Sequence, residues 1–206
     1  MNFLALITNK KIYKIVSIVI KYILKSKGIK VGKNFYCEGI PKLKINGKAC
    51  NIIIGDNVSF LGSVDLRNRE NGKIIIEDNV KLEEVRLVSA RDGVIKIGKN
   101  SVIGAYTIIN GGADVIIGED VLISTRVSIN ANEHKMAQKE KIKNQGYIHK
   151  SVIIEDDCMI GAGVAINKGV TIKQGSVIGA NAVVTKDTKE YGIYAGVPAK
   201  LLGERK

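Results

Sequence analysis

The two histidines of the chain lie in one polar segment that interrupts an otherwise repetitive sequence. His134 and His149 both fall within residues 130–150, NANEHKMAQKEKIKNQGYIHK. An imidazole with an ordinary pKa of about 6.5 can accept a proton near neutral pH, which suits it to general-base chemistry on a hydroxyl group. A histidine in a polar loop is more often simply solvated, so the residue type alone leaves both interpretations open.

Other reactive side chains are sparse. The three cysteines, Cys37, Cys50 and Cys158, are too few and too scattered for a disulfide framework or a zinc cluster. They favour a reducing compartment, so we expect a cytoplasmic protein without a bound metal ion. With 206 residues, 45% of them apolar, the chain is long enough for one domain with a substantial core.

The net charge of +12 is concentrated at the N-terminus. Residues 1–33 contain eight lysines and no acidic residue, which leaves 24 basic and 20 acidic residues in the remainder. The body of the protein is therefore nearly balanced. Nucleic-acid-binding domains more often spread basic residues over a recognition face with aromatic platforms, and we expect no nucleic-acid partner.

Residues 3–26 have the pattern of a basic amphipathic helix, which we assign to a segment 1–28. One stripe contains Lys10, Lys14, Ser17, Lys21 and Lys25, and isoleucine and valine fill most of the remaining circumference. The longest charge-free stretch within the lysines, 15–20, is far short of a membrane span. The helix is expected to pack on the body or a partner subunit, or to lie on an anionic membrane, which would place the protein at the inner face of the cell membrane.

An internal repeat organises the rest of the chain. A motif of Ile or Val, a Gly or polar residue, and two positions rich in Asn, Asp or Gly recurs seven times, beginning at Val31, Ile54, Ile76, Ile97, Ile117, Ile154 and Ile172. The last part is a strict hexad series: Ile154, Ile160, Ile166, Ile172, Ile178 and Val184. A six-residue apolar period suits short strands separated by tight turns, with three hexads making one coil of a stacked column.

The end of this series carries a family resemblance. The segments 183–187 (VVTKD) and 195–200 (AGVPAK) resemble the hexapeptide-repeat acyltransferases, and within them the maltose, galactoside and capsular-polysaccharide O-acetyltransferases. The resemblance implies an all-β domain over residues 29–206: a left-handed parallel β-helix of triangular section, about seven coils long, with a protruding loop at 130–150. It also implies a homotrimer with sites between subunits, and acetyl-CoA as the donor.

The same resemblance assigns the loop a role, because the family carries its catalytic histidine on such a loop. His134 matches that position, and its neighbours Asn132 and Glu133, together with Gln145, are candidates for substrate binding or for orienting the ring. His149 lies next to the returning coil, where a structural or rim position is expected. His134 would take the proton of a sugar hydroxyl during attack on the thioester, and return it to the departing thiolate.

Candidate donor-binding residues follow from the family positions on the last coils: Ala162, Ala180, Thr185, Lys186 and Lys200. Two departures from the family pattern stand nearby. Met159 occupies a position where the family often has Trp, and Lys168 replaces a Pro. Cys158 falls at the small inward position of its hexad, which predicts a core filler.

Several functions are compatible with this pattern. The leading hypothesis is acetyl transfer to a hydroxyl of a carbohydrate acceptor, such as a surface polysaccharide or its precursor. N-acetylation of an amino sugar nucleotide is the alternative within the same chemistry. A metal-dependent carbonic anhydrase on the same column needs three histidine ligands per site, and the presence of only two histidines in the chain argues against it. A non-catalytic β-solenoid scaffold is the alternative from another class, although it has no need of the histidine loop.

Overall fold

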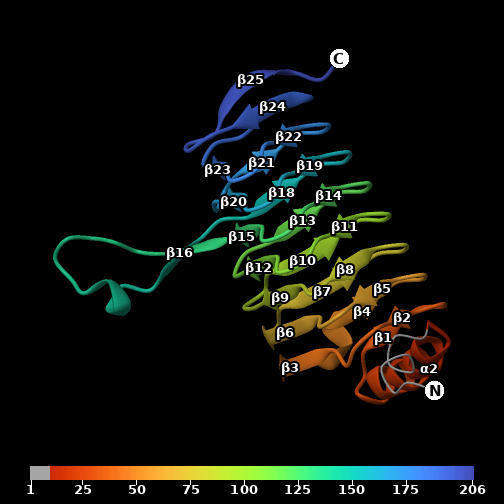
Figure 1. Cartoon of the computed structure of the whole chain (residues 1–206). Helices are drawn as coiled ribbons and strands as arrows, with labels where there is room; N and C mark the ends of the chain where they lie inside the picture. Colours follow the sequence, from red (N-terminus) through yellow and green to blue (C-terminus); the bar gives the residue numbers. More distant parts are fainter. Residues whose placement is uncertain (1–9) are drawn as a thin grey trace, which may run out of the picture.

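The computed structural model describes residues 10–206, which form one helix followed by a column of stacked coils (Figure 1). Each coil contributes one short strand to each of three sheets, so the column has three sides; the strands pair in parallel except for β24 and β25 at the C-terminal end. The architecture is therefore the triangular β-solenoid of about seven turns expected from the sequence.

The strands of the three sheets follow in stacking order. Sheet A contains β1 (Lys30–Val31), β4 (Ile52–Ile54), β7 (Lys73–Ile76), β10 (Val94–Ile97), β13 (Val115–Ile117), β18 (Val152–Ile154) and β21 (Thr171–Ile172). Sheet B contains β2 (Tyr36–Cys37), β5 (Ser59–Leu61), β8 (Lys81–Glu83), β11 (Val102–Ile103), β14 (Leu122–Ile123), β19 (Met159–Ile160), β22 (Val177–Ile178), β24 (Gly192–Ala195) and β25 (Lys200–Glu204). Sheet C contains β3 (Lys42–Gly47), β6 (Asp65–Glu70), β9 (Arg86–Ser89), β12 (Ile108–Gly111), β15 (Ser128–Asn130), β20 (Ala165–Ile166) and β23 (Val183–Val184). Two short 3-10 turns complete the set, η1 (Ala49–Asn51) and η2 (Ile142–Asn144).

The register of sheet A confirms the repeat position by position. The seven residues that begin the motif pair with one another in sequence, and all are buried: Val31, Ile54, Ile76, Ile97, Ile117, Ile154 and Ile172. The hexad residues of the last coils are buried as well. Cys158 is 1% exposed, and burial raises the pKa of its thiol to about 11, so it is an unreactive core filler as predicted.

A ladder of asparagines runs along the corner between sheets A and B. Asn34, Asn57, Asn79 and Asn100 all have left-handed backbone conformations, with φ between 50° and 62°. Each side-chain amide donates a 3.0 Å hydrogen bond to the oxygen of the next side chain, and Asn100 donates the last one to Asp120. Asparagine tolerates this conformation better than most residues, so the ladder explains its recurrence in the repeat.

Helix α2 (Lys10–Ser26) covers the first coil and packs against β1 and β2. Ser17, which the spacing places on the lysine stripe, is buried: it is 2% exposed, and its Oγ accepts a 2.8 Å hydrogen bond from the Cys37 N–H. With Ser17, Ile20 and Leu24 facing the column, the helix exposes an apolar face elsewhere, formed by Ile15, Ile18, Val19, Tyr22 and Ile23. Residues 3–9 of the predicted helix lie outside the described residues.

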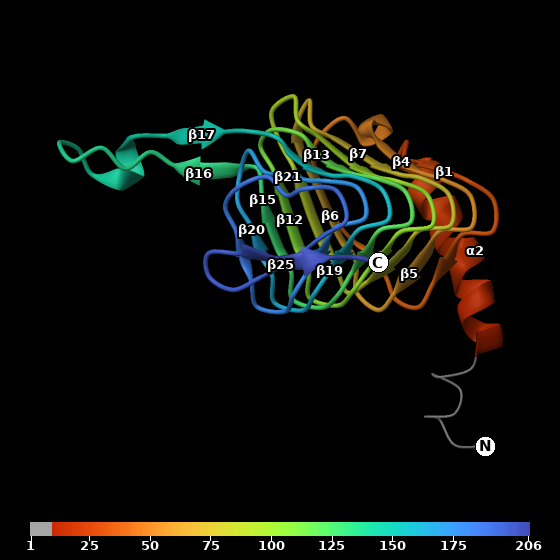
Figure 2. The same cartoon turned by 90° about the horizontal axis from the view of Figure 1, so that it is seen from above.

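Within residues 10–206 no helix has the length and apolar character needed to cross a membrane. The predicted loop at 130–150 is a β-hairpin, with β16 (Asn132–His134) antiparallel to β17 (Tyr147–His149). It leaves the column between β15 and β18 and extends well away from it, as both views show (Figure 2).

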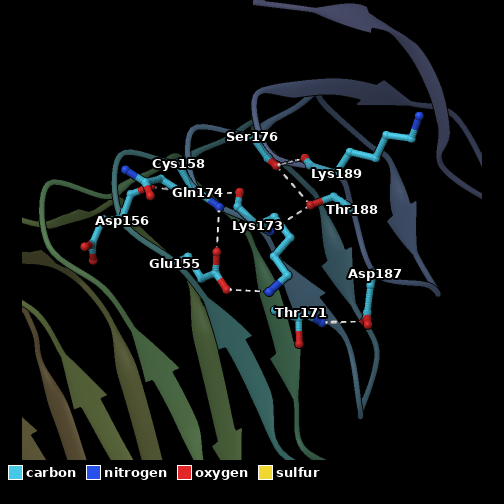
Figure 3. Close-up of polar contacts among 10 residues, drawn as sticks. All are labelled: Glu155, Asp156, Cys158, Thr171, Lys173, Gln174, Ser176, Asp187, Thr188 and Lys189. Carbon is cyan, nitrogen blue, oxygen red and sulfur yellow. Dashed lines mark hydrogen bonds and ion pairs between the residues drawn. The ribbon is translucent and has the colours of Figure 1, made fainter.

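Sheet A ends at β21, and residues 187–189 lie over Thr171 of that strand and Lys173 of the turn after it (Figure 3). Asp187 Oδ1 accepts a hydrogen bond from the Thr171 N–H, and Thr188 Oγ1 accepts one from the Lys173 N–H, each of 2.8 Å. Below them, Lys173 Nζ lies 2.8 Å from Glu155 Oε1, and this contact holds the pKa of Glu155 below its ordinary value. These contacts satisfy backbone groups that would otherwise end the sheet unpaired.

Candidate functional site

The hairpin presents its histidines on one of its two faces. Directly opposed residues in an antiparallel pair point to the same side, so Asn132 and His149 share a face with His134 and Tyr147. The His134 ring lies 4.1 Å from the Tyr147 ring, and Tyr147 lies 6.0 Å from His149, measured between centroids. The three rings therefore form a row, with His134 exposed at its outer end and His149 half-buried at the column.

The opposite face of the hairpin is anchored to the column. Glu133 forms an ion pair with Lys168, which follows β20. Lys168 is the residue that replaces the proline of the family pattern, so this departure fixes the hairpin. Because Glu133 and His134 point to opposite faces, this contact turns the carboxylate of Glu133 away from the ring row.

Gln145 closes the tip of the hairpin. Its Oε1 accepts a 2.6 Å hydrogen bond from the Ala137 N–H, and its Nε2 donates to the carbonyls of Ala137 and Glu140 at 2.8 and 2.6 Å. Both N–H groups of the amide are thus used within the loop. The contacts in the structure give Gln145 a loop-ordering role, while its predicted contact with substrate stays a prediction.

A groove of about 560 Å³ lies beside the base of the hairpin, on the outer face of sheet C. Asn132, Tyr147 and His149 form one end of it. The other principal lining residues carry no motif that marks them in the sequence; they are the arginines Arg67, Arg69, Arg86 and Arg91. Arg67 and Arg69 come from the outer face of β6 and Arg86 from the neighbouring strand β9, so the stacking of coils brings them together.

His149 is packed tightly against the column at the edge of this groove. A Cβ added to Gly112 would lie 2.6 Å from His149 Nδ1 and 3.1 Å from Asn132 Nδ2, so only glycine leaves room for both side chains. Among the described residues, Nδ1 of His149 is buried and has no hydrogen-bond partner. The rim position expected for His149 therefore agrees with the structure.

The candidate donor residues fall into two groups on the last coils. Ala162 and Ala180 occupy equivalent corners of successive coils, where the Asn181 N–H donates a 2.8 Å hydrogen bond to the Ala162 carbonyl. Lys200 pairs with Ala195, which stacks over Gly179 next to Ala180, so Lys200 lies above the same corner. Thr185 and Lys186 are exposed at the far end of β23. The structure thus groups three of the five along one corner.

No cluster of three or more potential metal ligands occurs in the part of the chain that the structure describes. The groove and the hairpin face beside it present imidazole, guanidinium and amide groups. Such a set can accept a proton, bind an anion and donate hydrogen bonds.

Comparisons with known proteins agree with the fold and the repeat. A family model described as the hexapeptide repeat of succinyl-transferase matches residues 151–186. No curated protein sequence matches the chain.

Solved structures resemble the chain over most of its length. A variant of AntD, an N-acyltransferase from Bacillus cereus in complex with dTDP-4-amino-4,6-dideoxyglucose and coenzyme A, is 25% identical, with a TM-score of 0.59 over 90% of this chain and 89% of that one. The polySia-specific acetyltransferase NeuO is also 25% identical, with a TM-score of 0.57 over 85% and 78%. A hexapeptide-repeat acetyltransferase from Vibrio cholerae, complexed with acetyl-coenzyme A, is 24% identical, with a TM-score of 0.52 over 73% and 72%.

Proposed function

We propose that the chain is an acyl-CoA-dependent acyltransferase of the hexapeptide-repeat family, and that it transfers an acetyl group from acetyl-CoA to a hydroxyl of a carbohydrate. The observation that supports this best is the hairpin. It holds an exposed imidazole, His134, in a row of rings that begins at a groove large enough for a small ligand.

In the proposed reaction, His134 acts as the general base. The neutral imidazole takes the proton of the sugar hydroxyl as its oxygen attacks the thioester carbonyl. Collapse of the tetrahedral intermediate breaks the C–S bond, leaves the acetyl group on the sugar oxygen, and returns the proton to the coenzyme A thiolate. Backbone N–H groups at the coil edge would stabilise the oxyanion, and no covalent enzyme intermediate is needed because a thioester is already activated.

The donor is proposed to lie along the corner formed by Ala162 and Ala180, with Lys200 and Lys186 as cationic partners for its phosphates. Small side chains at that corner leave space for a pantetheine arm. A homotrimer would place the hairpin of one subunit beside the donor corner of its neighbour, which would account for the exposure of His134 in the single chain.

N-acylation of an amino sugar nucleotide is the second candidate. It is favoured by the likeness to AntD, which is an N-acyltransferase. The same base would then act on an ammonium or amine in place of a hydroxyl. Paired acceptors that differ only in a hydroxyl or an amine at one carbon separate the two activities.

The deciding experiment measures acetyl transfer by wild type and His134→Ala, alongside calorimetric binding of acetyl-CoA. We expect His134→Ala to lose about 100-fold or more in turnover while donor binding is retained, because the loss of a general base affects chemistry and not binding. Lys143→Ala, on the same hairpin, is the matched control and should behave as wild type. Near-normal activity of His134→Ala, or no acetyl-CoA binding at millimolar donor, would overturn the proposal.

We also propose that helix α2 lies on an anionic membrane surface, on the cytoplasmic side. The helix turns five large apolar side chains away from the column, and three of them, Ile15, Val19 and Ile23, line an apolar groove of about 520 Å³ together with Ile40 and Leu43. Lys14, Lys21 and Lys25 border this apolar face at helical spacing, as in interfacial helices. Binding to phosphatidylglycerol vesicles should exceed binding to phosphatidylcholine vesicles and fall in Ile15→Asp; equal absence of binding to both would overturn this proposal.

A further inference from the structure

The choice of cation in the groove on sheet C is unusual for this chain. The sequence contains 26 lysines but only six arginines, and four of the six line this one groove. Lysine is therefore the ordinary surface cation of the protein. Arginine differs from lysine in presenting a planar fork of N–H donors that matches phosphate and carboxylate oxygens. The groove thus has the side chain that bidentate anion binding requires.

Asp65 positions two of the arginines. It is 7% exposed, and its carboxylate accepts hydrogen bonds from Arg67 Nε and Nη2, at 3.0 and 2.7 Å, and from Arg86 Nε at 3.1 Å. Arg86 uses only its Nε–H in this contact, which leaves its two terminal NH2 groups available. A buried carboxylate that fixes guanidinium groups at the edge of a groove lowers the entropy lost when they bind a ligand.

The groove carries an excess of positive charge that the protein itself does not neutralise. Its lining contains four arginines and no acidic residue, and Asp65 lies just outside it. Among the described residues, Arg69 and Arg91 form no ion pair and no side-chain hydrogen bond. Arg69 and Arg91 are exposed to solvent, so both guanidinium groups are free to bind a ligand that carries two or more negative charges.

We infer that this groove binds the acceptor through a phosphate or diphosphate group, so that the acceptor is a phosphorylated sugar and not a neutral one. The inference rests on the proposed function, because it assigns the substrate class of the same site. The groove ends at His149, and the ring row leads from there through Tyr147 to His134. A sugar whose phosphates contact the arginines extends along these rings, which places its hydroxyls toward the base.

The first test measures binding of inorganic pyrophosphate and uridine diphosphate by calorimetry at low salt. Wild type should bind both, and Arg69→Gln/Arg91→Gln should bind them about tenfold or more weakly, because each lost guanidinium removes charge-assisted hydrogen bonds. These two arginines are chosen because neither contacts Asp65, so their loss leaves the ion pairs of that carboxylate intact. Lys81→Gln/Lys99→Gln removes the same charge from exposed positions outside the groove and should bind as wild type.

The second test compares acetyl transfer to glucose, glucose 1-phosphate, a nucleoside diphosphate sugar and a polyprenyl diphosphate sugar. A phosphorylated acceptor should be preferred, and the preference should disappear in Arg69→Gln/Arg91→Gln. The last two acceptors distinguish a nucleotide from a lipid as the source of the diphosphate. The inference would be overturned if the two double variants bound pyrophosphate equally, or if wild type transferred acetyl groups to glucose as well as to the phosphorylated acceptors.

The two tests separate failure of this inference from failure of the proposed function. Loss of pyrophosphate binding in the arginine variant, without acetyl transfer to any acceptor, would support the anion site and contradict the proposed reaction. Equal transfer to neutral sugars by wild type and the arginine variant would support the proposed reaction and contradict the anion site.

Discussion

The upper and lower coils of the column differ in how closely they follow the repeat. The upper coils, residues 151–186, match the family model, and in sheet C their strands β20 and β23 have two residues each. The lower strands β3 and β6 of the same sheet have six residues each. A two-residue strand has one outward position, whereas β6 has three, occupied by Asp65, Arg67 and Arg69. The comparison teaches that regular coils maintain the column, and lengthened coils add the side chains of the groove.

The largest effect is expected from a substitution that disturbs the regular stacking of one coil on the next. A Cβ on Gly98 would lie 2.4 Å from the backbone C and O of Gly118 in the next coil, where nothing can yield. We expect Gly98→Ala to reduce the free energy of unfolding by about 2–3 kcal/mol, measured by urea titration. Gly203→Ala is the control: no atom lies within 4 Å of its added Cβ, and its effect should stay within about 0.5 kcal/mol. Equal stabilities of the two variants would contradict the close stacking of one coil on the next.

A smaller effect is expected from the asparagine ladder. Asn79→Ala removes the hydrogen bonds to Asn57 and Asn100 and leaves alanine at a φ of 62°. The expected loss is about 1–2 kcal/mol in the free energy of unfolding, without a change in pyrophosphate binding. Asn79→Gly permits the same φ, so the difference between the two variants isolates the backbone cost. Wild-type stability of Asn79→Ala would show that the ladder contributes nothing.

The smallest effect concerns the lower coils and depends on pH. Hydrogen bonding to Arg67, and then to Arg86, holds the pKa of Asp65 below its ordinary value. Because the folded pKa lies below the unfolded value of about 3.9, the ionised carboxylate stabilises the fold above that pH, and this contribution disappears as pH falls through the folded pKa.

Wild type should therefore lose more thermal stability between pH 5 and pH 3 than Asp65→Asn does, by about 2 °C in Tm. Glu204→Gln, an exposed change near the C-terminus, should follow the wild-type curve. Parallel curves for wild type and Asp65→Asn would contradict the role given to this carboxylate.

The column could be predicted from the sequence because its determinants are local and repeated. The motif at Val31, Ile54 and their equivalents identified residues that stack directly on one another. The small inward position of Cys158 followed from the same period. The burial of Ser17 did not follow from its spacing, which matches the lysine stripe, because its hydroxyl bonds to a backbone N–H twenty residues away.

The groove could not be predicted in the same way. Arg67, Arg69, Arg86 and Arg91 are ordinary surface residues by composition, and they become neighbours only through the coil-to-coil register. One signal was present: Arg86 follows Asp65 by 21 residues, which is the length of a coil in that part of the chain. The hairpin fold of residues 130–150 also depends on long-range contacts, including the pair of Glu133 with Lys168.

All hydrogen bonds of the asparagine ladder run in one direction, from each coil to the next one up, and this affects how coils can be added or removed. Every amide from Asn34 to Asn100 donates to the coil above, and Asp120, which can only accept when ionised, ends the chain of donors. The interior members are interchangeable, since each makes the same two contacts. Duplication or deletion of one complete coil between Asn57 and Asn100 would therefore leave both ends correctly bonded. Successive members of the ladder are 23, 22, 21 and 20 residues apart and keep the same bond, so single residues can be gained or lost on the other sides of a coil while this corner stays unchanged.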